Sequence, residues 1–251
     1  MRGGAERYDA RMADHESVVA LLAGASGFVG ARALDALLDA PEVTRVFAVT
    51  RRALGREHPR LANRIVQFDQ LERQLAGLKC QVAFCCLGAR LGERLAAGDE
   101  ACRRVDLGYS LAFARAAKAA GTSRFVVISA AGADVAAKTG YLRIKGELER
   151  QLGSLGFSSL DILQPALVLG WPREARAIDM LRRAVMPIAN PFLTGPRMMY
   201  RGIPVGTTAA AMVGTLRSGR RGTQRYTYAG IGALAQFKSR RAATPVAMTA
   251  S

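Results

Sequence analysis

The sequence is poor in residues that bind metal ions or form disulfide frameworks. Its 251 residues include two histidines and four cysteines, and no two of these cysteines form a C-x-x-C pair. A zinc site needs several Cys or His ligands at short spacing, and a secreted framework needs paired cysteines. We therefore expect no metal site and no disulfide framework. The adjacent Cys85 and Cys86 are interpreted as small apolar residues of a buried strand.

Long apolar segments are also missing. No apolar run reaches the roughly 18 uncharged residues that a membrane-spanning helix needs. The first residues include Glu6, Asp9, Asp14 and Glu16, which do not suit the basic start of a signal peptide. We expect a cytoplasmic protein with a flexible leader over residues 1–16.

Acidic residues are absent from the last part of the chain. After Asp179 there are 11 Lys or Arg residues and no Asp or Glu, and the whole chain carries a formal net charge of +16. This segment favours an anionic partner, either an anionic small-molecule substrate or the acidic lipids of a membrane that it would contact peripherally. The alternative is that the arginines are solvated surface residues. Nucleic acid is not expected, because the sequence has no basic patch rich in aromatics and no nucleic-acid motif.

The apolar pattern predicts the fold class. Short, uninterrupted apolar runs, typical of buried parallel strands, alternate with amphipathic helical stretches. This alternation predicts an α/β fold with a doubly wound parallel sheet of the Rossmann type. The expected strands cover residues 17–23, 44–50, 64–68, 81–86, 124–129 and 159–164, and the expected helices cover 28–39, 99–120 and 138–154.

The pattern changes after residue 170. Residues 171–185 and 204–219 each indicate one helix, and residues 225–231 (RYTYAGI) indicate a short strand. These elements are too few for an independent domain with its own core. We therefore expect one Rossmann-type domain over residues 17–234, with a small C-terminal lobe for the substrate from about residue 171, and a loose tail over 235–251.

Three glycines stand close together between the first expected strand and the helix after it. In GASGFVG, Gly24, Gly27 and Gly30 are spaced three apart. In a doubly wound fold this turn holds the pyrophosphate of a dinucleotide. The first glycine permits the sharp exit from the strand, the second removes a side chain where phosphate meets backbone, and the third lets the helix pack on the sheet. The alternative is that the glycines serve packing alone. The residues of this turn expected to bind the cofactor are Gly24, Ser26, Gly27, Phe28, Val29 and Gly30.

The next two expected strands end in residues that bear on the choice of cofactor. Thr50 takes the position where an NAD-binding protein has a carboxylate for the ribose hydroxyls, and Arg51 and Arg52 follow it. An arginine fork binds a 2′-phosphate through charge-assisted hydrogen bonds. The sequence therefore favours NADP(H) and leaves NAD(H) open, the alternative being arginines that only face solvent. Asp69 follows the third expected strand, where its carboxylate can accept a hydrogen bond from the adenine amine. The alternative is that it caps the start of a helix, and both roles can hold together.

The stretch GYLRIKGELE predicts the reactive end. Tyr141 and Lys145 are four residues apart and share one face of a helix. A neighbouring ammonium favours the phenolate and brings the pKa of a tyrosine toward the working range, so that the phenol can exchange a proton at neutral pH. The lysine can also reach the ribose of a nicotinamide nucleotide. Ser129 ends the preceding strand, where its hydroxyl can hold a substrate carbonyl or cap the strand exit.

Five segments of the chain match one family pattern: GASGFVG, FCCLGAR, RRVDLGYSLAFARAAKAAGTSRFVVISAAGAD, YLRIKGELE and LQPALVLG. Together they resemble the short-chain dehydrogenase/reductase superfamily. More narrowly, they resemble its atypical, epimerase-like branch, which contains the NADPH-binding Tat-interacting oxidoreductase. The resemblance runs from about residue 17 to residue 230 and implies the same Rossmann-type fold and cofactor class.

The resemblance also bears on residues after two further strands and on one residue of the helix expected over 99–120. Asp106 stands near the position where the wider superfamily has a catalytic tetrad asparagine, and because this chain has an aspartate there we assign it no catalytic role. Gln164 stands where related proteins usually carry an arginine before the proline, a departure beside the substrate pocket. The residues that would line the cofactor are Cys86, Leu87 and Gly88 after the fourth strand, and Pro165, Ala166 and Leu167 near the nicotinamide carboxamide.

Three functions are compatible with these residues. The first is an NADP(H)-dependent oxidoreductase in which Tyr141 protonates a carbonyl oxygen, Lys145 tunes Tyr141 and Ser129 orients the substrate. The second is a nucleotide-sugar epimerase or dehydratase that uses its cofactor transiently. The third is a non-catalytic regulator that binds NADPH and reports its level to a partner. The intact Tyr141–Lys145 pair favours an enzyme.

Overall fold

Seven parallel strands form the central sheet. The computed structural model describes residues 17–89, 91–170, 190 and 193–237. The strands lie in the order β3-β2-β1-β4-β5-β6-β9, and every neighbouring pair is parallel. The strand order reverses between β1 and β4, which confirms the predicted doubly wound sheet. The strands are β1 Val18–Ala23, β2 Val43–Thr50, β3 Leu61–Ile65, β4 Val82–Cys85, β5 Arg124–Ile128, β6 Ser159–Leu163 and β9 Gly222–Tyr226.

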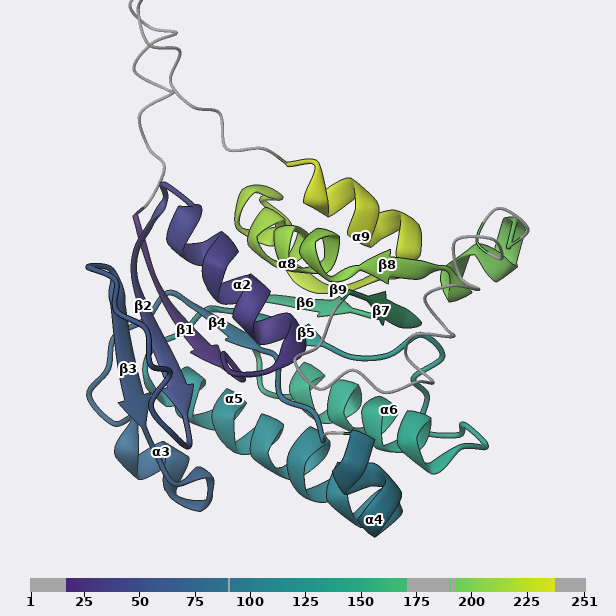
Figure 1. The fold of residues 1–251 in the computed structure, drawn as a ribbon, viewed down its shortest axis with the longest axis horizontal. Coiled ribbons are helices and arrows are strands. Elements are labelled where there is room, and N and C mark those ends of the chain that lie inside the picture. The colour runs from purple at the N-terminus through teal and green to yellow at the C-terminus, as the bar shows by residue number, and fades with distance from the viewer. Residues whose placement is uncertain (1–16, 90, 171–189, 191–192, 238–251) are drawn as a thin grey trace, which may run out of the picture.

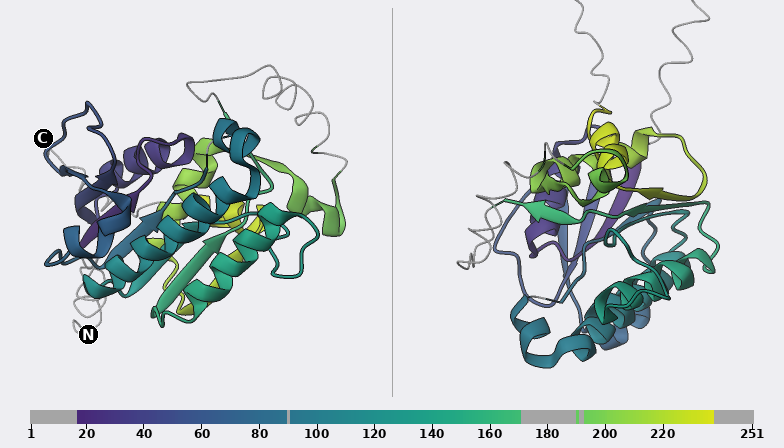
Figure 2. Two further views of the ribbon diagram at one scale, coloured as in Figure 1. Left: turned by 90° about the horizontal axis from the view of Figure 1, so that it is seen from below. Right: turned by 90° about the vertical axis from the view of Figure 1, so that its right-hand side faces the viewer.

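Helices cover both faces of the sheet (Figure 1). α2, α8 and α9 pack on one face, and α3, α5 and α6 pack on the other, so the sheet lies between two helical layers (Figure 2). The helices are α2 Phe28–Asp39, α3 Leu71–Gln74, α4 Leu91–Cys102, α5 Ser110–Ala119, α6 Gly140–Gly153, α8 Val205–Gly214 and α9 Tyr228–Ala235. None of the helices in the described ranges is long and apolar enough to cross a membrane.

The core consists of two apolar clusters, one on each face of the sheet. Because successive side chains of a strand point to opposite faces, Ala20 and Leu22 of β1 join the cluster under α2 and α8. Leu21 and Ala23 join the cluster under α5 and α6. All four are fully buried. Burial on both faces explains why the strand reads as a continuous apolar run instead of an alternating one.

The helix expected over residues 99–120 is divided into three segments. α4 ends at Cys102, a π-helix (η3, Arg103–Tyr109) follows, and α5 begins at Ser110. A π-helical turn holds more residues than an α-helical turn and therefore changes which side chains face the sheet. In η3 the residue that turns inward is Asp106, which is 2% exposed.

The C-terminal part of the chain returns to the main sheet. β9 pairs with β6 at the sheet edge, while β7 (Leu167–Leu169) and β8 (Gly202–Pro204) form a separate parallel pair. The predicted strand over 225–231 is wrong in its second half, because α9 begins at Tyr228. Ile231 and Leu234 of that helix are buried, and their spacing fits a helix that packs on α8. The predicted leader and the helix over 171–185 lie outside the described residues. Of the tail predicted over 235–251, Ala235 still belongs to α9, and the part from residue 238 lies outside the described residues.

The reversal of strand order brings two loops together at the carboxyl ends of the strands. Gly24 follows β1 and Cys86 follows β4, and these strands are neighbours. A Cβ atom added to Gly24 would lie 2.6 Å from the carbonyl oxygen of Cys86. In doubly wound folds ligands bind at this edge, at the point of reversal. Most of the residues singled out from the sequence lie at this edge or in the loops that follow it.

Candidate functional site

The glycine-rich turn combines two packing positions with one open position. Gly24 has a φ of +84°, which favours glycine. At Gly30, a Cβ atom would lie 2.0 Å from the carbonyl oxygen of Gly24, so only glycine lets α2 pack this close to the turn. At Gly27 the nearest atom to an added Cβ is the same oxygen, at 3.1 Å, and the residue is exposed. Packing therefore accounts for Gly24 and Gly30, and it accounts much less for Gly27.

Gly27 is the N-cap of α2, and no side chain caps this helix end. The first backbone N–H groups of a helix point outward and carry the positive end of its dipole. Ser26 is exposed beside Gly27, while Phe28 and Val29 are half-buried. An exposed helix start with a glycine in place of a capping side chain fits the diphosphate of a dinucleotide.

The loop after β2 is held by an asparagine that the sequence reasoning missed. Asn63 of β3 donates hydrogen bonds to the Thr50 hydroxyl (2.7 Å) and to the Ala48 carbonyl (3.1 Å), and accepts one from the Leu54 N–H (2.9 Å). Thr50 is buried, and its hydroxyl donates to the Arg52 carbonyl at 2.7 Å. These contacts fix the backbone of the loop that carries the two predicted arginines.

Arg51 and Arg52 are both exposed at the end of β2. The position of Thr50 holds a neutral side chain whose hydrogen bonds are made within the chain. No carboxylate of this strand end therefore opposes a phosphate. Both arginine side chains are accessible to solvent, and the preference for a 2′-phosphate stays a prediction.

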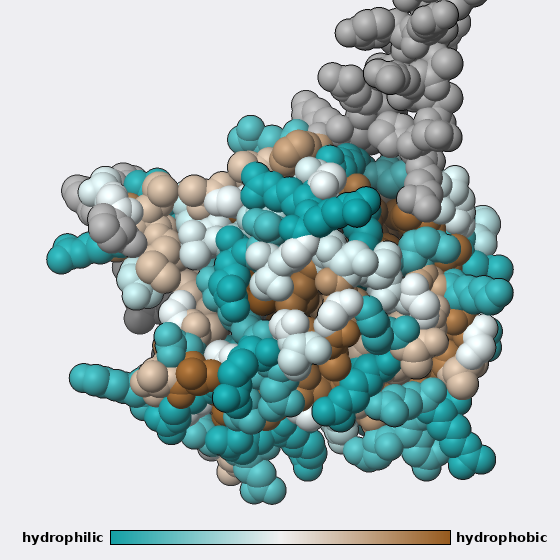
Figure 3. Space-filling view, turned by 180° about the vertical axis from the view of Figure 1, so that it is seen from behind, coloured by the Kyte–Doolittle hydropathy of each residue, from teal (hydrophilic) through white to brown (hydrophobic). Residues whose placement is uncertain are grey.

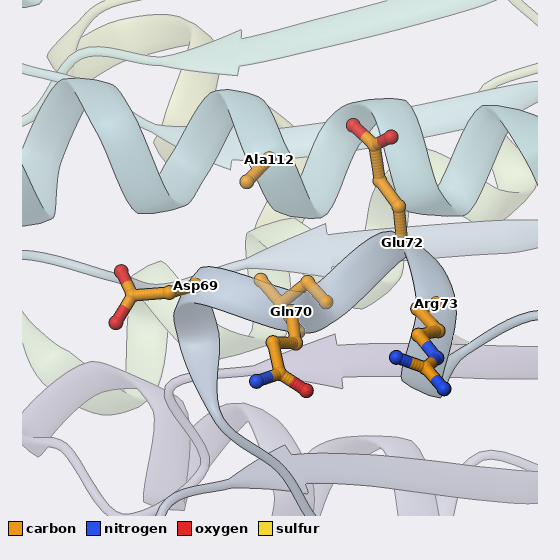
Figure 4. Close-up of a pocket in the computed structure, with 6 residues that line it drawn as sticks. Asp69, Gln70, Glu72, Arg73 and Ala112 are labelled. Carbon is orange, nitrogen blue, oxygen red and sulfur yellow. The ribbon is translucent and has the colours of Figure 1, made fainter.

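Asp69 lies away from the Tyr141–Lys145 pair. It belongs to the short 3-10 helix η2 (Phe68–Gln70), is exposed, and lines a cavity of about 560 Å³ between α3 and α5 (Figure 4). The N-cap residues of η2 and α3 are Gln67 and Gln70, so the capping role proposed for Asp69 is wrong. Contact with an adenine stays a prediction. The cavity is lined by Asp69, Gln70, Leu71, Glu72, Arg73 and Ala112.

Of the predicted pair on α6, Lys145 is buried and Tyr141 is half-buried. The Lys145 ammonium lies 2.8 Å from Asp106 Oδ1, 3.3 Å from the Ile128 carbonyl oxygen and 5.9 Å from the centre of the Tyr141 ring. Burial lowers the pKa of the ammonium, but the Tyr141 phenol and the Asp106 carboxylate raise it more, so that its pKa lies above the ordinary value. Lys145 therefore stays charged beside Tyr141 across the neutral range.

Asp106 connects this pair to the loop after β4. Its Oδ1 pairs with Lys145, and its Oδ2 accepts a hydrogen bond from the Ala89 N–H at 2.9 Å. The preceding Gly88 is exposed, and a Cβ atom on it would lie 3.4 Å from Oδ1. A carboxylate can form an ion pair with the lysine, whereas an asparagine at this position could only accept a hydrogen bond from it. The departure from the family pattern thus creates a buried ion pair.

The residues predicted to line the cofactor after β4 and β6 have mixed surroundings. Burial raises the pKa of the Cys86 thiol, which lies 3.6 Å from the Met212 sulfur, so this cysteine stays protonated and apolar. Burial likewise raises the pKa of Cys85. Leu87 and Leu167 are half-buried. Pro165 is buried, its carbonyl accepts the Ala131 N–H at 3.2 Å, and Ala166 is exposed.

Ser129 is tied to a carboxylate on α6. Its hydroxyl donates to Glu149 Oε1 at 2.5 Å, and the Gln164 amide donates to the same oxygen at 2.8 Å. Arg225 of β9 pairs with Glu149 Oε2 at 2.9 Å. Because Tyr141, Lys145 and Glu149 are spaced four apart on α6, this helix brings all three to the end of β5, where Ser129 lies. Gln164, which stands in place of the usual arginine, is a donor within this network.

Comparison with known proteins identifies relatives of this chain. The sequence pattern of the NAD dependent epimerase/dehydratase family matches residues 20–141. Protein HTATIP2 of Rattus norvegicus is 32% identical over 200 residues, which cover 78% of this chain and 79% of that protein. The mitochondrial protein fmp52 of Aspergillus fumigatus is 32% identical over 179 residues, which cover 69% of this chain and 76% of that protein. The chain belongs to the same family as HTATIP2 and fmp52, and it carries the NAD dependent epimerase/dehydratase pattern over residues 20–141.

The match confirms the predicted resemblance to the atypical, epimerase-like branch of the short-chain dehydrogenases/reductases, whose Rossmann domain binds NAD(P). MoeE5, solved with UDP-glucuronic acid and NAD, superposes with a TM-score of 0.63 at 18% identity, covering 82% of this chain and 74% of that one. The UDP-N-acetylglucosamine 4-epimerase of Methanobrevibacter ruminantium M1 gives 0.61 at 16% identity, covering 84% and 77%. At these identities the likeness shows the fold.

Several arginines of the basic C-terminal segment contact other residues of the same chain. Arg217 pairs with Glu42 at 2.6 Å, and Arg225 pairs with Glu149. Arg201 and Arg220 lie 5.4 and 5.7 Å from the ring centres of Tyr228 and Tyr226. Hydrophilic residues form most of the face seen from behind, and apolar residues are visible there only in small groups (Figure 3). These contacts favour a structural explanation for part of the positive charge. Contact of the segment with an anionic partner stays a prediction.

Proposed function

We propose that this protein is an NADP(H)-dependent oxidoreductase that transfers hydride to or from a carbonyl or alcohol substrate. The observation that carries the proposal is the charged, buried Lys145 beside Tyr141, held at the end of β5 by Asp106. The Lys145 ammonium lies 5.9 Å from the centre of the Tyr141 ring, so its positive charge would attract the negative charge that forms on the phenol oxygen when Tyr141 gives up its proton.

The glycine-rich turn and the loop after β2 would hold the cofactor. The diphosphate would lie against the start of α2 at Gly27, and Arg51 and Arg52 would bind a 2′-phosphate. When bound, the reduced nicotinamide supplies a hydride to the carbonyl carbon. Tyr141 gives its proton to the carbonyl oxygen, and Lys145 stabilises the negative charge that this leaves on the phenol. In the reverse direction the same phenolate takes the proton of the alcohol.

Binding and turnover test the proposal separately. Titration of the purified chain with NADPH and NADH, followed by nucleotide fluorescence, should give tighter binding of NADPH. An Arg51→Ala/Arg52→Ala double variant should lose this preference, whereas Arg150→Ala, at the exposed end of α6, should keep it.

Turnover is then measured as loss of absorbance at 340 nm with a panel of aldehydes, ketones and quinones. We expect activity that Tyr141→Phe abolishes without weakening NADPH binding by more than a few-fold. Tight NADPH binding without turnover of any compound would instead favour the non-catalytic regulator.

A nucleotide-sugar epimerase or dehydratase is the second candidate, because the matching family carries that description and the superposed structures hold UDP-sugars. Incubation with UDP-glucose or UDP-N-acetylglucosamine and NAD, followed by chromatography of the sugar products, distinguishes it. Formation of an epimer or a dehydrated sugar without net change in NADH would contradict the oxidoreductase proposal and support this second candidate.

A further inference from the structure

The Ser129 hydroxyl has only one proton, and the structure shows where it goes. A serine hydroxyl is one donor and two acceptors, whereas an ionised carboxylate only accepts. The Ser129 oxygen lies 2.5 Å from Glu149 Oε1, at the short end of the range for hydroxyl–carboxylate bonds. The proton therefore lies between Ser129 and Glu149. What Ser129 can offer to a substrate in this arrangement is a lone pair.

The surroundings of Glu149 keep it an acceptor. Gln164, directly after β6, and Arg225 of β9 both donate to it, and the Glu149 side chain is 3% exposed. A substrate carbonyl is a weaker acceptor than a carboxylate. If Ser129 turned its proton to such a carbonyl, a buried carboxylate would lose its shortest hydrogen bond, which is unfavourable. A ketone alone therefore does not redirect Ser129.

We propose that Glu149 is a positioning residue that makes Ser129 a hydrogen-bond acceptor, so that the enzyme prefers carbonyl substrates with a hydroxyl donor beside the carbonyl. This inference rests on the proposed oxidoreductase function. Tyr141 is then the donor to the reacting oxygen, and Ser129 accepts from the neighbouring hydroxyl. The substrate class is an α-hydroxy ketone or aldehyde, and in the reverse direction a vicinal diol.

A matched pair of substrates tests this preference. Hydroxyacetone and methoxyacetone both carry an electron-withdrawing oxygen beside the carbonyl, and only hydroxyacetone can donate a hydrogen bond. With NADPH, kcat/KM for hydroxyacetone should exceed that for methoxyacetone by about 10-fold or more, the effect of one buried hydrogen bond. Ser129→Ala and Glu149→Met should both bring this ratio close to one, because methionine leaves no carboxylate to take the Ser129 proton. Glu147→Met, the same change two residues away on α6, should leave the ratio unchanged.

Four outcomes of the kinetic comparison are distinguishable. Equal turnover of both ketones by the unmodified enzyme overturns the inference and leaves the proposed function intact. A Ser129→Ala variant that loses activity on both ketones to the same extent also overturns it, because Ser129 would then donate to the carbonyl. Absence of turnover with either ketone, while other compounds of the aldehyde, ketone and quinone panel are reduced, overturns the substrate class and leaves the proposed function intact. Absence of turnover with the whole panel, while NADPH binds, overturns both.

A second measurement needs neither cofactor nor turnover. In urea unfolding of the chain alone, Ser129→Ala and Glu149→Met should be non-additive, since each removes the same hydrogen bond. Ser129→Ala combined with Glu147→Met should be additive. If the effects of the Ser129 and Glu149 variants were additive, the two side chains would not interact, and the acceptor role of Ser129 would be contradicted.

Discussion

Replacing Gly27 with alanine separates the two explanations of the glycine-rich turn. Gly24 and Gly30 cannot make this distinction, because an added methyl group would meet backbone atoms at 2.6 and 2.0 Å. Their alanine variants should be destabilised by about 3 kcal/mol whether or not a nucleotide binds. At Gly27 the φ of −83° is open to any residue, and the nearest atom to a new Cβ lies 3.1 Å away.

The expected effects of Gly27→Ala on stability and on binding differ in size. Alanine is a poorer N-cap than glycine, but it also restricts the unfolded chain, so the free energy of unfolding should change by less than about 1 kcal/mol. If the diphosphate contacts this backbone, the methyl group displaces it from one charge-assisted hydrogen bond, worth about 1.5–3 kcal/mol. Such a loss weakens NADPH binding by roughly 10- to 100-fold.

The assay combines urea unfolding with calorimetric titration of NADPH. Gly206→Ala is the matched control, since Gly206 lies in α8 and an added Cβ would have no neighbour within 4 Å. This control should gain about 0.5–1 kcal/mol of stability and bind NADPH normally. A Gly27→Ala protein that folds and binds NADPH like the unmodified chain would refute the reasoning, because the turn would then serve packing alone.

Three further predictions follow from buried polar contacts. Asp106→Ala should lower the free energy of unfolding by about 3–5 kcal/mol in urea, because it leaves the Lys145 charge buried without a partner, whereas Asp106→Asn should lose less. Burial and the Asp161 carboxylate raise the pKa of Tyr226 to about 12, so the folded state holds this proton more tightly than the unfolded state. The contribution of this proton to the free energy of unfolding is complete below pH about 10 and is lost as the pH rises to about 12. Unfolding curves measured across this pH range should show a decline that is smaller in Tyr226→Phe by about 2 kcal/mol. Asn63→Ala should weaken NADPH binding about 3- to 10-fold in a fluorescence titration, because the loop after β2 loses three hydrogen bonds, and an unchanged affinity would show that the loop keeps its shape without them.

The parts of the fold that the sequence predicts well are those whose signal is local. Continuous apolar runs predict the inner parallel strands because such strands are buried on both faces. The strand predicted over 64–68 is misplaced, because the edge strand β3 covers Leu61–Ile65 and its side chains are half-buried or exposed. The spacing of Tyr141 and Lys145 predicts that they share a face of α6. The π-helix over Arg103–Tyr109 is not predicted, because its apolar pattern resembles that of an ordinary helix. RYTYAGI is predicted as one strand, although the chain turns into α9 at Tyr228, because short apolar runs suit a strand or a buried helix equally well.

The candidate site shows the same division between local and distant signals. Glu149 follows Lys145 at the same spacing of four, so the motif itself contains the signal that identifies it. Arg225 has no such signal, because it reaches Glu149 from β9, 76 residues away along the chain. The contact exists only because β9 pairs with β6 and returns the C-terminal segment to the sheet. Thus the residues proposed for the proton chemistry can be found from spacing, whereas the arginine that pairs with Glu149, the partner of Ser129, is brought there by the strand order.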